Sequence, residues 1–314
     1  MQTVGTVGLW ISFFVIVAVV LGIDFYFLKR KKSHIMTMRK AGAWVTLWMM
    51  CALVFNLLLW LHLRHTIHPE IADQRSLEFL TGYIIEKSLS VDNMFAFLAI
   101  FSYFTIPAEY QRRVLIYGVL GAVILRFIVI ISGVWLVNAF HWVLYLFGIL
   151  LLITGLKMLF SREEKQDISK NILLNWLKKH LPVTHEFHGN QFFVKLNKYW
   201  YVTPMFLALV LIECSDLVFA LDSIPAIFAI TNDTFIIFTS NIFAILGLRA
   251  LYFVLANLAD RFHLLKYGIA VLLIFIGVKM LIEPWIKIPI FIALSAVVAI
   301  LGTTILLSMK IKRI

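Results

Sequence analysis

The chain has 314 residues, of which 62% are hydrophobic and only 14% charged, and its mean hydropathy is +0.93. Soluble domains are about half apolar and about a quarter charged, so this composition excludes an ordinary soluble protein and predicts an integral membrane protein. The formal net charge of +11 could suggest nucleic-acid binding, but the basic residues gather in alternate loops, which indicates a role in membrane topology instead.

Apolar runs of the length that crosses a bilayer, about 20 residues as a helix, follow one another along the chain. They cover approximately residues 7–28, 41–61, 79–104, 114–137, 142–160, 203–230, 234–257, 266–283 and 288–309. We therefore predict an all-α, polytopic membrane protein of about nine transmembrane helices. The first run is expected to remain in the protein, because no positive region precedes it and no small-residue cleavage site follows it.

The loops between these runs differ sharply in basic charge. Loops on one side hold twenty Lys and Arg residues, and loops on the other side hold three. By the positive-inside rule, the basic side faces the cytoplasm, which places the N-terminus outside and the C-terminus inside. The expected location is the inner (plasma) membrane, crossed several times.

An internal repeat organises the chain, with an offset of 122 to 124 residues. Residues 92–96 match residues 216–220, Arg126 falls on Arg249, and the segment that starts at Gly155 matches the segment that starts at Gly277. Each copy contains three spans, so the second copy is predicted to be inverted in the membrane, with a substrate site near the midplane. The expected organisation is 1–76 (two helices), 77–160 (first repeat), 161–202 (cytoplasmic connector), 203–285 (second, inverted repeat) and 286–314 (last helix and basic tail).

The connector is the longest polar stretch. Residues 170–181 carry apolar residues at helical spacing among lysines, which predicts an interfacial helix on an anionic leaflet. Residues 192–196 and 199–202 flank an Asn-Lys pair and predict a short hairpin. A structured linker and a regulatory or gating segment are both compatible with this pattern.

The first of two acidic clusters lies at 86–93, with the sequence EKSLSVDN. On a helix, at about 100° per residue, Glu86, Ser90 and Asn93 fall within about 60° of one another, and Asp92 lies about 100° from Asn93. These four side chains are expected to line one polar wedge. Lys87 falls outside the wedge, as a counter-ion, a tether to the outer headgroups or a direct participant.

The second cluster combines Glu213 and Asp216 with Asp222, three residues before Pro225. A straight helix cannot aim all three carboxylates at one point, because Asp222 lies opposite Glu213. Proline removes an amide donor and disfavours helix in the preceding residue, so we predict that the span is broken or kinked near Asp222.

Carboxylates are costly at membrane depth, and these two clusters keep five of them there, which is most simply explained by a cation that must bind and move. Carboxylate, amide and hydroxyl oxygens suit hard divalent cations such as Mn²⁺, Mg²⁺ and Ca²⁺. Zinc and copper are disfavoured because neither cluster contains histidine, and Cys214 is a lone thiol candidate. The candidate ligands are Glu86, Asp92, Asn93, Glu213, Asp216 and Asp222.

A structural alternative stays open for these clusters. Their carboxylates could be protonated, or paired with Arg126 and Arg249, which lie deep in predicted spans and need partners there. Other polar residues have structural interpretations too: Lys157 and Lys279 near span ends can snorkel. The remaining weak candidates are Asn56 and Asn241 as interhelical hydrogen-bond partners, Asp24 at an inner span end, and the histidine sets His62, His65, His68 and His185, His188.

The segments 86–93, 213–216 and 219–226 resemble signature segments of the TerC family of bacterial integral membrane proteins, and 243–250 and 277–281 extend the likeness. Within that family the chain is most similar to the Alx branch. The family is placed near the LysE-type exporters and is named for tellurite resistance. The resemblance implies Mn²⁺ efflux and supports the acidic clusters as the ion site.

The working hypothesis is therefore a transporter that exports Mn²⁺ through a site centred on Asp92 and Asp216, with no enzymatic activity and no resident cofactor. No Walker-type motif is present, so proton exchange through the same carboxylates is the simplest energy source. The expected partners are the lipid bilayer and the divalent cation, with no nucleic acid, and the oligomeric state stays open.

Three rivals remain. One is a membrane assembly or metalation factor that acts through protein partners, and another is a tellurite-resistance-associated protein without direct Mn²⁺ transport. An intramembrane aspartyl protease is disfavoured, because a catalytic dyad needs two carboxylates and the chain supplies five without a G-x-G-D element.

Overall fold

The computed structural model describes residues 3–30, 37–140, 142–160, 168, 171–184, 187, 189–196, 199–258 and 264–310. Within helices, the described side chains do not include Leu21, residues 23–30, Asp92, Leu221, Asp222, Asn257 and Leu258.

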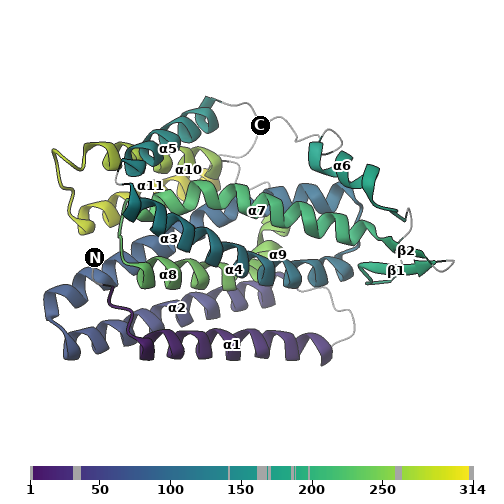
Figure 1. Cartoon of the computed structure of the whole chain (residues 1–314), viewed down its shortest axis with the longest axis horizontal. Helices are drawn as coiled ribbons and strands as arrows, with labels where there is room; N and C mark the ends of the chain where they lie inside the picture. Colours follow the sequence, from purple (N-terminus) through teal and green to yellow (C-terminus); the bar gives the residue numbers. More distant parts are fainter. Residues whose placement is uncertain are drawn as a thin grey trace.

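Helices make up almost all of the described chain (Figure 1). In chain order they are α1 (Val7–Arg30), α2 (Met38–Thr66), α3 (Pro69–Tyr103), α4 (Ala108–Ala139), α5 (Val143–Phe160), α6 (Ile172–His180), α7 (Pro204–Phe228), α8 (Thr234–Leu246), α9 (Leu248–Leu258), α10 (Leu265–Ile282) and α11 (Ile290–Lys310). Each of the nine apolar runs lies on a helix, and the run at 234–257 lies on two. The prediction of an all-α polytopic membrane protein is confirmed.

Six of these helices are long and apolar enough to cross a membrane: α2, α4, α5, α7, α10 and α11. A seventh span results if α8 and α9, which are bent by 43° at Gly247, count as one broken span. In α1 the shorter apolar stretch is Val7–Val20, and α3 carries the charged residues of the first acidic cluster. Nine spans therefore remain a prediction.

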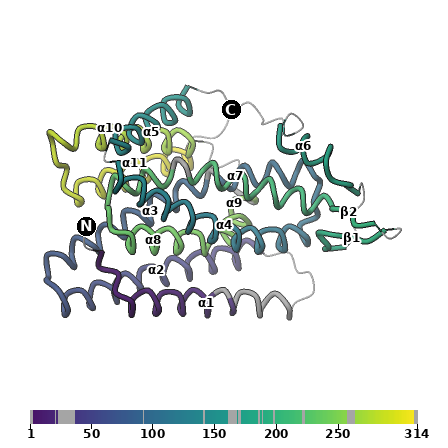
Figure 2. Tube along the Cα trace, viewed as in Figure 1, coloured from purple at the N-terminus to yellow at the C-terminus, as the bar shows by residue number. Residues whose placement is uncertain are grey.

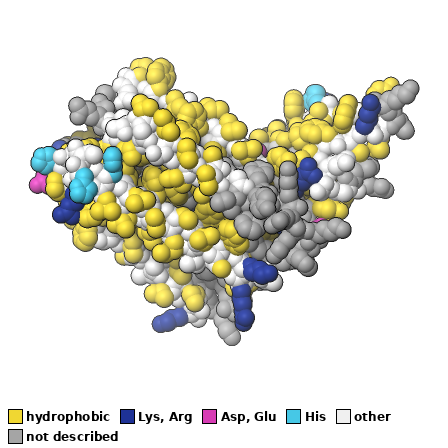
Figure 3. Space-filling model, turned by 90° about the horizontal axis from the view of Figure 1, so that it is seen from below, with side chains coloured by type: hydrophobic (Ala, Val, Ile, Leu, Met, Phe, Trp, Pro, Cys, Tyr) yellow, Lys and Arg dark blue, Asp and Glu magenta, His cyan; other side chains and the backbone are white. Residues whose placement is uncertain are grey.

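The surface agrees with a bilayer environment. Figure 3 shows hydrophobic side chains across the middle of one face, with histidines gathered at its left end and most Lys and Arg side chains toward its bottom and right edges. Large apolar side chains such as Leu58, Ile128 and Ile153 are more than half exposed. Their hydrophobic surface is the expected complement of lipid tails.

The helices form three groups in space (Figures 1 and 2). In both views α5, α10 and α11 lie on one side, α1 and α2 lie on the other, and α3, α4, α7 and α8 lie between them. Helices α3 and α4 each pack against both α7 and α8. Both acidic clusters therefore lie on central helices, α3 and α7.

Aromatic rings attach α1 and α2 to this centre. The ring of Phe13 on α1 lies within 6.0 Å of Phe55 on α2 and within 5.7 Å of Phe238 on α8. Phe55 in turn stacks at 4.7 Å on Phe243. Such edge and tilted contacts add to the dispersion energy of the packed helices.

Helices α5 and α10 cross with their backbones in close approach. A Cβ atom added at Gly148 would lie 3.3 Å from the carbonyl oxygen of Gly277, and one added at Gly155 would lie 2.8 Å from that of Ala270. Small residues permit such crossings where apolar packing, rather than the hydrophobic effect, drives association in a bilayer. A shift of 122 residues exchanges these two contacts with each other, as an antiparallel pair of equivalent helices would require.

The predicted break near Asp222 is wrong. Helix α7 continues through Pro225 and ends at Phe228. Proline lies in the last turn, so it removes one helical hydrogen bond there, and a helix at membrane depth otherwise satisfies its own backbone. The bend lies in the next span, between α8 and α9.

The connector contains the two predicted elements. Helix α6 buries Leu174 and Leu177 while Trp176 remains 54% exposed. Strands β1 (Phe193–Leu196) and β2 (Tyr199–Val202) pair antiparallel, with Phe193 opposite Val202. Both elements lie at the right end of the molecule in Figure 1, and the hairpin turn at 197–198 lies outside the described residues.

We expect Gly277→Ala to destabilise the protein, because a Cβ atom there would lie 2.8 Å from the carbonyl oxygen of Gly148. Overpacking of this kind costs about 1–3 kcal/mol. Thermal unfolding of the purified protein in detergent measures the loss. Gly302→Ala is the matched control, because nothing lies within 4 Å of its added Cβ; equal melting temperatures for the two variants would contradict the close crossing.

Candidate functional site

The first acidic cluster places three polar side chains inside the protein. Glu86, Ser90 and Asn93 on α3 are exposed by 0%, 0% and 2%. This confirms that the three residues share a buried face, as their helical spacing predicts. Polar groups at this depth need partners, since an unpaired buried polar atom costs about 1–3 kcal/mol.

Arg126 on α4 supplies the main partner. Its side chain is fully buried, and its Nη1 donates to Oε1 of Glu86 and, at 2.7 Å, to Oδ1 of Asn241 on α8. Its Nη2 and Nε lie 3.3 and 3.4 Å from the two carboxylate oxygens of Asp216 on α7. Arg126 therefore joins four helices at one point.

A fourth link closes this polar centre. The side-chain amide of Asn93 donates to Oδ1 of Asp216 at 3.3 Å, so α3 and α7 are also joined directly. The prediction that Arg126 pairs with a cluster carboxylate is confirmed, for Glu86 and Asp216 both. In this conformation, helix-to-helix ion pairing therefore neutralises part of the charge of these two carboxylates.

Several buried oxygens on α3 and α7 have no hydrogen-bond partner among the residues that the structure describes. They are Oε2 of Glu86, Oδ1 of Asn93 and the hydroxyls of Ser90 and Ser223. All four side chains are at least nine-tenths buried. Native proteins rarely leave such groups unsatisfied, so this set marks a place where a ligand would gain several interactions at once.

Glu213 lies one helical turn from Asp216 on α7 and is half-buried. Its Oε2 is likewise without a partner in the described part of the chain. The carboxylate lies against Gly121 of α4, where an added Cβ atom would overlap it. Glycine at 121 therefore makes room for this carboxylate beside the polar centre.

Of the six predicted ligands, the structure brings together Glu86, Asn93 and Asp216, with Glu213 on the neighbouring turn. The side chains of Asp92 and Asp222 lie outside the described residues. Among the described residues, no group of three or more His, Cys, Asp and Glu is arranged to hold a metal. What the described residues bring together is two carboxylates, Glu86 and Asp216, beside the side-chain amide of Asn93.

Two polar residues outside the candidate ligand set also bond between helices. Asn241 is confirmed as an interhelical hydrogen-bond partner, because it accepts from Arg126. Lys87 donates to the carbonyl oxygen of Ala244 at 3.1 Å, in the last turn of α8 just before the bend. The polar residues were visible in apolar sequence, but their partners on other helices were not.

The weaker candidates have separate outcomes. Asn56 donates to Ser76 at 2.9 Å between α2 and α3, which confirms an interhelical bond. The snorkelling predicted for Lys279 is wrong, because its side chain is buried and donates to the carbonyl oxygen of Ala229 at the end of α7. Its repeat equivalent, Lys157, is exposed.

The remaining weak candidates differ in how far their side chains are exposed. Arg249 is buried and Cys214 is a half-buried free thiol. His62, His65 and His68 are exposed near the junction of α2 and α3. Asp24, His185 and His188 lie outside the side chains that the structure describes.

Comparisons with known proteins identify relatives along the full length. The model of the Integral membrane protein TerC family matches residues 71–313. A protein of Escherichia coli (strain K12) named Alx, with the description membrane-bound redox modulator, is 51% identical over 308 residues, or 98% of this chain and 96% of its own. Uncharacterized membrane proteins of Myxococcus xanthus and Rickettsia bellii are 43% and 41% identical, over 98% and 93% of this chain and 93% and 94% of theirs. No solved structure matches.

Removing Arg126 is expected to destabilise the protein strongly, because it leaves Glu86 and Asp216 as unpaired buried charges. Breaking a buried pair in this way costs about 3–5 kcal/mol. We predict that Arg126→Met lowers the melting temperature sharply and that the double variant Arg126→Met/Glu86→Gln loses less than the sum of its two single variants. Unfolding in detergent, analysed as a double-mutant cycle, measures the coupling. Strictly additive losses would show that the pair is not energetically coupled.

Proposed function

This chain belongs to the TerC family of integral membrane proteins, and from that premise we propose that it transports divalent metal cations, Mn²⁺ first among them, out of the cytoplasm. The observation that carries the proposal is the polar centre: the buried carboxylates of Glu86 on α3 and Asp216 on α7 meet at Arg126, and Asn93 bonds Asp216. Oε2 of Glu86 and Oδ1 of Asn93 have no partner in the described part of the chain.

The ligand chemistry supports a hard cation. Glu86, Asp216 and Asn93 offer oxygen atoms only, and Ser90 and Ser223 add hydroxyls. Mn²⁺ and Mg²⁺ prefer this kind of coordination, whereas zinc and copper recruit imidazole or thiolate. Glu213 is the nearest described carboxylate that could enter the same coordination sphere.

Arg126 would stabilise the two carboxylates of the polar centre when no metal is bound. Its guanidinium carries one positive charge between two carboxylates, so the empty site is not left with two bare negative charges at low dielectric. A divalent cation that binds the same oxygens must displace the guanidinium from at least one carboxylate. Binding and helix rearrangement are then linked, because Arg126 lies on α4 and its partners lie on α3, α7 and α8.

Repeat symmetry and alternating access fit this arrangement. The two acidic clusters come from the first helices of the two predicted repeats, and the contact pair of α5 with α10 is exchanged by the repeat offset. Sites between inverted repeats near the midplane are typical of secondary transporters. Export against an inside-negative potential needs a driving force, and proton exchange through the same carboxylates would supply it.

The name of the Alx relatives raises redox modulation as a second function. This chain has two cysteines, Cys51 on α2 and Cys214 on α7, and both are free, half-buried thiols. Its own residues therefore offer no closed dithiol couple, whereas they do offer a buried oxygen-rich centre. An effect on cellular redox state would follow from metal transport, since manganese is itself redox-active.

Transport is tested with purified protein in liposomes that contain a Mn²⁺-sensitive dye. We expect Mn²⁺ flux that increases with an opposing proton gradient and falls by about tenfold or more in Glu86→Gln and Asp216→Asn, in keeping with the loss of a ligand charge. Mg²⁺ and Ca²⁺ in the same assay define selectivity.

Glu70→Gln is the matched control, because Glu70 lies in the first turn of the same helix and is exposed. Gel filtration and melting temperature show whether each variant is folded. Folded Glu86→Gln and Asp216→Asn proteins with wild-type flux would overturn the site. Wild-type protein without flux, combined with loss of cellular function on changes in 161–202, would favour the assembly or metalation factor.

A further inference from the structure

A second polar region lies away from Arg126, at the end of the bundle where α3 begins and α10 ends. It is a cavity of about 520 Å³ lined by parts of α3, the α7–α8 turn, α10 and the segment before α11. That volume is within the range of small-molecule sites, about 300–1,000 Å³. The proposed transport assigns no role to this cavity.

Lys279 is the unusual residue of the cavity wall. Lysine is rarely buried unless it is paired; this side chain is only 7% exposed and is in electrostatic interaction with the carboxylates of Glu283 and Glu78. It donates to the carbonyl oxygen of Ala229, which uses one of the three N–H donors of an ammonium group. A buried cation at the wall favours an anionic group in the cavity and disfavours passage of a metal cation.

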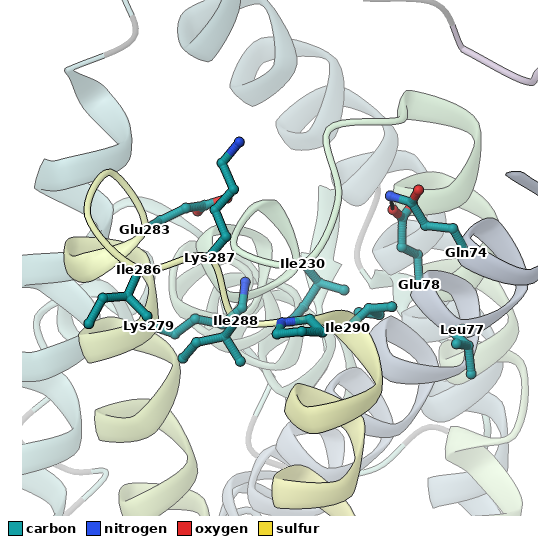
Figure 4. Close-up of a pocket in the computed structure, with 11 residues that line it drawn as sticks. Gln74, Leu77, Glu78, Ile230, Lys279, Glu283, Ile286, Lys287, Ile288 and Ile290 are labelled. Atoms are coloured by element: carbon teal, nitrogen blue, oxygen red, sulfur yellow. Dashed lines mark hydrogen bonds between the residues drawn. The ribbon is translucent and has the colours of Figure 1, made fainter. Parts of the chain in front are cut away.

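The other charged side chains that line the cavity are Glu78, Glu283 and Lys287. Glu78 accepts hydrogen bonds from Gln74 at 2.8 Å and from Arg75 and Thr231 at 2.6 Å each, so its charge is already balanced. Glu283 and Lys287 are exposed at the rim. Figure 4 shows these two on one side of the cavity, with Gln74 and Glu78 on the other.

The rest of the wall is apolar, and so is the surface beside it. Isoleucines 230, 286, 288 and 290 line the cavity together with Leu77. Next to them Trp285 is 80% exposed and Phe291 is 66% exposed. Exposed tryptophan beside lysine at a helix end is typical of the membrane–water interface, where headgroups lie.

We propose that this cavity binds the headgroup of a zwitterionic phospholipid that carries a primary amine. Lys279 and Lys287 hold its phosphate, Glu283 accepts hydrogen bonds from its ammonium, and the isoleucines contact the start of its acyl chains. Two ammonium groups and a carboxylate on an apolar, interfacial cavity match this amphiphile group by group. Bound lipid would fill the space between α3, α10 and α11 and so stabilise that end of the bundle.

Native mass spectrometry of the full-length protein, titrated with phosphatidylethanolamine in detergent, tests the proposal. We expect one retained lipid, and about tenfold weaker retention in Lys287→Met and Lys279→Met, in keeping with the loss of a charge-assisted hydrogen bond. Lys287 is exposed, so its variant reports binding even if Lys279→Met folds poorly. Glu283→Gln should remove the preference for ethanolamine over choline headgroups.

Lys157→Met is the matched control, since Lys157 is the repeat equivalent of Lys279 and is exposed. Equal retention by the control and both cavity variants would overturn the proposal, as would a wild-type preference for phosphatidylglycerol. Inorganic phosphate provides a further arm. If phosphate alone raises the melting temperature in a Lys287-dependent way and displaces the lipid, the site binds free phosphate instead. A fall in Mn²⁺ flux with unchanged lipid retention would assign the cavity to cation exit.

Discussion

The structure depends on one buried guanidinium. Arg126 contacts Glu86, Asp216 and Asn241 from three other helices, with its own side chain fully buried. In low dielectric, each of these charges alone would be prohibitively costly, and together they are tolerable only in this geometry. The four helices are therefore joined at one polar centre, to which the bond from Lys87 on α3 to Ala244 on α8 adds a second polar contact.

That same constraint makes the centre suitable for exchange. A guanidinium and a divalent cation compete for the same carboxylate oxygens, so occupancy by one excludes full occupancy by the other. Unpartnered oxygens on Glu86, Asn93 and Ser90 mean that the ion-paired state is not fully satisfied among the described residues. Under the proposed transport, a centre left partly unsatisfied in this way would be only moderately stable without its cation, which would let the cation bind and leave.

The sequence predicted well whatever depends on one helix at a time. Helical spacing places Glu86, Ser90 and Asn93 on one face, and the cost of a bare charge predicts a partner for Arg126; both hold in the structure. The failures concern relations between elements. Pro225 was expected to break or kink α7, but the helix continues for only three residues beyond it, so only the last turn is affected. Lys279 was expected to snorkel, but the end of α7 supplies a carbonyl acceptor. Neither the residue at which α7 ends nor the carbonyl group that Lys279 contacts can be inferred from local sequence.

The helices contact one another in two different ways: by close backbone packing between α5 and α10, and by polar side chains among α3, α4, α7 and α8. The α5–α10 crossing brings Gly148 against the backbone of Gly277. Sliding or rotation of one helix on the other would therefore cause backbone atoms to clash. The contacts of α3 and α4 with α7 and α8 pass through hydrogen bonds and ion pairs, which a cation can replace one by one. Lys87, bonded to the end of α8 beside its bend, ties this polar centre to a broken span. Under the transport proposed above, rearrangement on cation binding would involve the central four helices, while the close α5–α10 crossing would stay fixed.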